Sequence, residues 1–197
     1  MNTHKFIVLL PHRDSRLVLD DFRQRFFAAG FNGAYAFPPV APLARVSQAY
    51  NGEELKALAQ GLRRLSLLKD RKFTASQLSC PQAGIMEGTD FFGPLLDLPP
   101  LDGILVSDKV LFTFPRTVLC AALLGQVDGE LLTLKLISNT KRSFVQAPDF
   151  QPFSFRAAMV TNLAIRPLKR GAAPYSFEWR LGPGCWLPKQ VADNSDL

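Results

Sequence analysis

A repeated strand pattern constrains the fold of this chain more than any other sequence feature. In residues 37–47 a Phe-Pro-Pro entry leads into an apolar segment, and residues 114–123 repeat a Phe-Pro entry before a second apolar segment. When the two segments are aligned, Arg116 takes the position of Val40. Side chains at positions i and i+2 of a strand share a face, so each segment predicts a strand that presents paired side chains to one side.

The first of these segments contains three prolines, Pro38, Pro39 and Pro42. Proline cannot donate a hydrogen bond to a β-ladder, so it is confined to edges, strand entries and bulges. We therefore predict an irregular entry followed by an edge strand or a bulge, continuing as a strand to Val46.

The first third of the chain predicts two strand–helix pairs. Residues 6–10 form an apolar run closed by Pro11, which is typical of a buried strand. Two amphipathic helices follow, because apolar residues recur at spacings of three and four. The first is expected to be capped by Asp14 or Ser15, to bury Val18, Phe22, Phe26 and Ala29, and to end at Gly30; the second spans residues 53–68 and buries Leu55, Leu58, Leu62 and Leu65.

The remainder of the chain predicts short strands separated by proline and glycine. The clearest are residues 91–98, 117–124, 131–137, 153–165 (with a bend) and 176–181, and Gly182-Pro183-Gly184 is expected to break the chain after the last of them. Helices followed by a run of strands indicate an α+β fold. We expect residues 1–188 to form a single two-lobed domain and residues 189–197 to form a flexible C-terminal tail.

The segment Phe37-Pro38-Pro39-Val40-Ala41-Pro42-Leu43-Ala44-Arg45 resembles a motif of the two-histidine phosphoesterase superfamily, which includes 2'-5' RNA ligase-like proteins. That motif reads Phe-x-Pro-His-x-Thr-Leu-Ala-Arg. The resemblance implies a bilobal α+β fold with antiparallel-rich sheets and two main amphipathic helices. In that family each lobe contributes one catalytic strand to a shared cleft.

This chain departs from the family motif at every catalytic position. The two histidine positions hold Val40 and Arg116, and the two hydroxyl positions hold Pro42 and Val118. None of these side chains transfers a proton near neutral pH, and arginine stays protonated above pH ~12. The resemblance therefore implies a degenerate site with no catalytic residues. Its cleft would be apolar, with Arg116 and Arg45 as the cations.

A non-catalytic binding protein is the leading functional hypothesis. The ligand is expected to be a small anionic molecule, a nucleotide or RNA, held by Val40, Pro42, Arg45, Arg116 and Val118. The formal net charge of +6 permits an anionic partner but also serves solubility. Two alternatives stay open: an active phosphoesterase or RNA ligase-like hydrolase that uses non-standard residues, and a protein-interaction module.

No pattern in the sequence predicts a metal or a cofactor. The three cysteines are scattered, and the only histidines are His4 and His12, so closely spaced ligands are missing. His12 is followed by Arg13, Asp14 and Ser15, but adjacency in sequence does not make a catalytic triad. We interpret this segment as a loop and a helix cap.

Two tryptophans lie near the end of the chain, seven residues apart. Trp179 and Trp186 are expected to be core or lid residues, with base stacking as the alternative. The apolar runs are too short to span a membrane, and no signal-peptide pattern opens the chain, so a cytoplasmic protein without membrane contact is expected. The sequence does not indicate an oligomeric state.

Overall fold

The computed structural model describes residues 3–28, 38–63, 71–73, 78–79, 89–97, 100–101, 103–105, 107–114, 116–118, 122–126, 153–167 and 177–187. The fold is α+β, as the order of elements predicts, and combines antiparallel sheets with two helices. The predicted strand over residues 131–137 and the tail over residues 189–197 lie outside the described residues.

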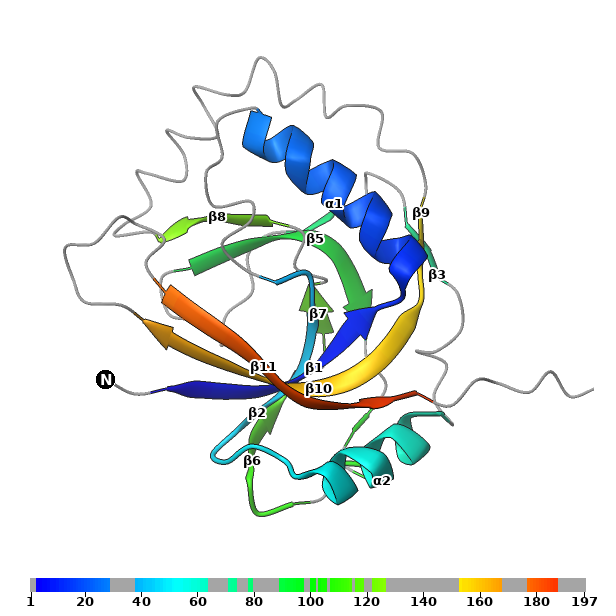
Figure 1. Cartoon of the computed structure of the whole chain (residues 1–197), viewed down its shortest axis with the longest axis vertical. Coiled ribbons are helices and arrows are strands. Elements are labelled where there is room, and N and C mark those ends of the chain that lie inside the picture. The colour runs from blue at the N-terminus through cyan, green and yellow to red at the C-terminus, as the bar shows by residue number, and fades with distance from the viewer. Residues whose placement is uncertain are drawn as a thin grey trace, which may run out of the picture.

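The centre of the fold is a five-stranded antiparallel sheet (Figure 1). Its strands are β1 (His4–Pro11), β2 (Ala41–Val46), β6 (Val110–Thr113), β10 (Ala157–Pro167) and β11 (Phe177–Trp186), in the order β11-β10-β1-β2-β6. β1 lies in the middle, which explains its apolar sequence: Phe6, Ile7, Val8 and Leu9 are all fully buried. Strands covered on both faces read as continuous apolar runs rather than as alternating patterns.

Helix α2 (Gly52–Arg63) covers one face of this sheet and contacts β10 and β11. Asn51 and Glu54 form a capping box: the Asn51 side chain accepts from the Glu54 amide at 2.9 Å, and Glu54 accepts from the Asn51 amide at 2.6 Å. The predicted stripe is confirmed for Leu55, Leu58 and Leu62, which are buried. Leu65 lies outside the described residues.

Helix α1 (Arg13–Ala28) contacts β1, and Figure 1 shows it on the opposite side of the sheet from α2. The prediction that Val18 is buried is wrong, because its side chain is 42% exposed. The described side chains of α1 that are buried are Ser15, Leu19 and Arg23, four residues apart. The predicted burial of Phe22, Phe26 and Ala29, and the predicted end at Gly30, lie outside what the structure describes. Both polar members have partners: Arg23 pairs with Asp20 at 3.5 Å, and the Ser15 hydroxyl accepts from the amide of Arg156. A polar residue with a nearby partner can be buried, and the apolar spacing alone did not reveal this.

The predicted caps of α1 are also wrong. The helix begins at Arg13, and the carbonyl of His12 accepts the first helical hydrogen bond, from the Arg16 amide at 2.9 Å. The Ser15 hydroxyl accepts from the amide of Arg156 at 3.0 Å. Ser15 therefore joins the helix to the start of β10 rather than capping the helix.

The other sheets are smaller. β5 (Thr89–Asp97) pairs with β4 (Leu78–Ser79), β7 (Arg116–Val118) and β8 (Ala122–Gln126), and β3 (Arg71–Phe73) pairs with β9 (Phe153–Phe155). The single strand predicted over residues 117–124 is therefore two strands, β7 and β8, that pair with different parts of β5. The bend predicted within residues 153–165 is confirmed, because β9 and β10 belong to different sheets and are separated by Arg156.

The three prolines predicted an edge strand or a bulge, and the bulge is present in β2, as a register shift opposite Ile7 and Val8. β2 is not an edge strand, since it pairs with both β1 and β6. The predicted break at Gly182-Pro183-Gly184 is likewise a bulge, and β11 runs through it. Among the described residues, no helix is long and apolar enough to cross a membrane.

Candidate ligand-binding site

The bulge in β11 places two exposed tryptophans on the same face of the sheet. Trp179 and Trp186 are seven positions apart, an odd number, so a regular strand would point them to opposite faces. Trp179 pairs with Ile165 and Trp186 with Met159, two positions that share a face of β10. The register shift between Thr161 and Leu163 gives β11 one extra residue, so that Trp179 and Trp186 point to the same face.

The bulge is held by a buried hydroxyl. Thr161 Oγ1 donates to the carbonyl oxygen of Gly182 at 2.9 Å, with the Pro183 carbonyl oxygen at 3.2 Å. Thr161 is itself completely buried. A hydroxyl has one proton to donate, so Thr161 bonds to one of these two carbonyl groups at a time and ties β10 to the bulge.

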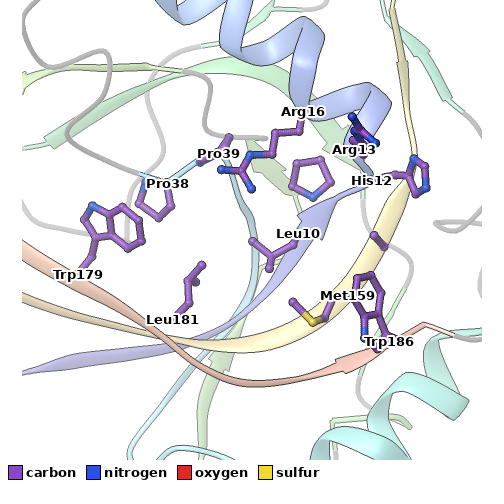
Figure 2. A pocket seen from close by; sticks show the side chains of 12 residues that line it. Leu10, His12, Arg13, Arg16, Pro38, Pro39, Met159, Trp179, Leu181 and Trp186 are labelled. Carbon is purple, nitrogen blue, oxygen red and sulfur yellow. The ribbon is translucent and has the colours of Figure 1, made fainter.

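A pocket of about 360 Å³ lies on this face of the sheet (Figure 2). Trp179 and Trp186 stand at its two ends, 42% and 74% exposed, and the floor between them is apolar. Pockets for small ligands have volumes of about 300–1,000 Å³ and are mostly apolar with a few polar groups. The apolar lining consists of Leu10, Pro11, Pro38, Pro39, Ala158, Met159 and Leu181 together with the two tryptophans.

The polar groups of the pocket come from the first turn of α1. Arg13 and Arg16 both line it, and Figure 2 shows Arg16 reaching across the pocket toward Pro39. Arg16 pairs with Asp20 at 3.7 Å, and within the described part of the chain Arg13 has no ion-pair partner. The N-terminal end of a helix already carries partial positive charge, so arginines in this turn are unfavourable for the helix alone. Their position concentrates positive charge at the rim of an apolar pocket.

His12 also borders the pocket. Its Nδ1 lies 3.4 Å from Oδ2 of Asp14, and the His12 side chain is 41% exposed. Figure 2 shows the His12 ring pointing away from the pocket interior. Of the segment His12-Arg13-Asp14-Ser15, only His12 connects β1 to α1, and the other three residues form the first turn of the helix. The Ser15 hydroxyl accepts from the amide of Arg156, the residue before β10.

The structure brings the predicted strand beside this pocket, but two of its predicted site residues are not exposed. Val40, Pro42 and the preceding residues Pro38 and Pro39 are all buried, and of these four Pro38 and Pro39 line the pocket. Ligand contacts of Val40 and Pro42 stay a prediction.

The guanidinium of Arg45 forms a hydrogen bond with His4. Its Nη2 donates to Nδ1 of His4 at 2.7 Å, and because guanidinium has no acceptor, Nδ1 must be unprotonated. Burial, and secondarily the charge of Arg45, holds the pKa of His4 below its usual value. His4 is thus a neutral acceptor that fixes the orientation of Arg45.

The other two predicted site residues, Arg116 and Val118, are the ends of β7. β7 belongs to a different sheet from β2, and the two strands contact each other (Figure 1). The segments containing Val40 and Arg116 are therefore neighbours. The role of the Arg116 and Val118 side chains as ligand contacts stays a prediction.

The pocket residues that sequence reasoning missed include Arg13, Arg16 and Met159. The two arginines carried a detectable signal, since a helix rarely gains from cations in its first turn. The placement of both tryptophans on one face carried no signal in the sequence, because it depends on the bulge in β11. The described residues include no group of three or more His, Cys, Asp or Glu side chains that could hold a metal ion.

The fold and the site define an α+β protein whose central antiparallel sheet carries an apolar pocket with two cations at its rim. No protein-family model matches the chain, and no curated protein matches it. A comparison with solved structures finds a crystal structure described as a phosphoesterase, 14% identical, with a TM-score of 0.35, covering 95% of this chain and 100% of the other. A likeness of this degree carries no conclusion about activity.

Proposed function

We propose that this chain is a non-catalytic binding protein for a small anionic ligand with a planar apolar body, of which a nucleotide is the simplest example. The scaffold proposed is the bilobal one of the two-histidine phosphoesterases, with β2 and β7 as the strands of its two lobes. The single observation that carries the proposal is the pocket itself: two exposed tryptophans, an apolar floor and two arginines on one rim.

Each part of the pocket suits one part of such a ligand. Arginine binds phosphate or carboxylate through charge-assisted hydrogen bonds, and the first amides of α1 add partial positive charge beside Arg13 and Arg16. An exposed indole such as Trp179 or Trp186 offers a face on which a planar ring can stack, worth about 1–3 kcal/mol for a nucleic-acid base. Contiguous exposed apolar surface marks ligand-binding grooves, and the two exposed tryptophans border one apolar pocket.

Hydrolysis of a phosphate ester is the second candidate, and the position of His12 is the observation that favours it. His12 borders the pocket and has a carboxylate partner in Asp14. Acid–base cleavage needs a group within hydrogen-bond reach of the proton it transfers, and the His12 ring points away from the interior (Figure 2). Binding without turnover is therefore the function that the geometry supports best.

Calorimetric titration with adenosine 5'-monophosphate, adenosine and inorganic phosphate tests this proposal. The monophosphate is expected to bind at least about tenfold more tightly than either fragment, because a charge-assisted hydrogen bond contributes ~1.5–3 kcal/mol and a stacked base a similar amount. Equal affinity for the monophosphate and adenosine would mean that Arg13 and Arg16 do not bind the phosphate. Absence of binding by all three would refute it, and release of phosphate during the titration would favour the hydrolase.

A further inference from the structure

The floor of the pocket between the two tryptophans is made by a side chain from the neighbouring strand. On this face β11 presents Trp179, Leu181, Gly184 and Trp186 in turn, and Gly184 leaves a gap in the row. Met159 of β10 fills that gap. A Cβ atom built on Gly184 would lie 2.5 Å from Met159 Sδ, 3.0 Å from Cγ and 3.1 Å from Cε, so the thioether lies directly on the glycine.

Any side chain at position 184 must therefore displace Met159. Contacts of a Cβ below 3.0 Å essentially do not occur in proteins, and the atom concerned is near the end of a flexible side chain, which can move at little cost. The neighbours of Met159 across the sheet are its register partners Leu10 and Trp186, which occupy the space on either side. A displaced Met159 side chain would therefore move away from the sheet, into the cavity of about 360 Å³ that it lines.

We propose that Gly184 is the residue that sets the depth of the pocket. By allowing Met159 to lie flat on β11, it keeps the space between Trp179 and Trp186 open for a planar ring, which then meets a polarizable thioether below it. This inference rests on the proposed function for the identity of the ligand. The seating of Met159 on Gly184 is independent of that function.

Affinity measurements on three variants test the inference. Gly184→Ala is expected to weaken binding of adenosine 5'-monophosphate by about tenfold or more, because the displaced Met159 side chain then occupies the space that the ring needs. Adding Met159→Ala to Gly184→Ala should restore the affinity to that of Met159→Ala alone, since the displaced side chain is then gone. Gly52→Ala is the control, because a Cβ on Gly52 meets nothing within 4 Å. Equal affinity in wild type and Gly184→Ala would overturn the inference.

A second readout works without any ligand and separates this inference from the proposed function. The chain has three methionines, so the ε-methyl signal of Met159 can be assigned by its loss in Met159→Ala. Gly184→Ala should shift this signal while Gly52→Ala leaves it in place. If wild type binds no monophosphate but the signal shifts, the proposed function fails and the seating holds. An unchanged signal in Gly184→Ala would refute the seating itself.

Discussion

Replacing Arg13 and Arg16 together with alanine is expected to weaken binding of adenosine 5'-monophosphate by about a hundredfold. Each guanidinium can contribute a charge-assisted hydrogen bond of ~1.5–3 kcal/mol to the phosphate, which corresponds to a factor of ten or more. Binding of adenosine should change little, because it lacks the charged group. Isothermal titration calorimetry on wild type and the double variant measures both effects.

A matched control for this variant removes two positive charges elsewhere. Lys56 and Arg63 are exposed on α2, on the other side of the sheet from α1 (Figure 1). Lys56→Ala with Arg63→Ala should leave the affinity within about twofold, since exposed charges farther than a Debye length of ~8 Å are largely screened. If both double variants lose affinity equally, the attraction is a property of the net charge and not of the pocket.

The arginine variant should also fold as well as wild type. Positive side chains in the first turn oppose the helix macrodipole, at a cost of about 0.3–1 kcal/mol each. Removing Arg13 and Arg16 is therefore expected to leave the free energy of unfolding unchanged or slightly higher, as measured by urea denaturation. A large loss of stability would mean that the two arginines have a structural role.

The largest expected effect on stability is at Asn162. Its side-chain Oδ1 accepts from the amide of Tyr50 at 2.9 Å, and its Nδ2 donates to the carbonyl of the same residue at 2.8 Å. Both contacts are buried, so Asn162→Leu leaves two backbone groups without partners. At about 1–3 kcal/mol for each, the free energy of unfolding should fall by about 2–6 kcal/mol, measured by urea denaturation.

Gln48→Leu is the control for Asn162→Leu. Gln48 is exposed two residues before Tyr50, so this change adds the same apolar side chain without removing a buried hydrogen bond. Its effect should stay within about 0.5 kcal/mol, as is usual for surface substitutions. A similar loss in both variants would mean that adding a leucine, and not removing the Asn162 hydrogen bonds, accounts for the effect, and the importance of the Asn162 side chain would be refuted.

The parts of the fold that could be predicted from sequence are those in which local pattern and burial agree. The sequence of β1 is continuously apolar because the strand lies in the middle of the sheet and its side chains are buried on both faces. Helix α2 has a capping box and a regular leucine stripe. The stripe of α1 could not be predicted in the same way. Its buried positions include Ser15 and Arg23, which have polar partners in the folded chain.

The candidate site was less predictable, because it depends on contacts between distant segments. The bulge at Gly182–Gly184 reverses the face to which every later residue of β11 points. In the sequence, two glycines around a proline predict the end of a strand rather than a bulge within it. Two residues of the motif around Val40, Pro38 and Pro39, line the pocket. The motif did not indicate that Val40 would be buried, or that the cations beside the prolines would come from α1.

The central claim is that a ligand with both an anionic group and a planar ring binds between the two tryptophans. The chain has two tryptophans, and both line the pocket, so a ¹H–¹⁵N spectrum contains one indole Nε1–H signal from each end of it. On titration with adenosine 5'-monophosphate, both signals should shift along saturable curves that give the same Kd. Inorganic phosphate at the same concentrations should leave them nearly unchanged. Two stationary indole signals at saturating monophosphate would contradict the claim.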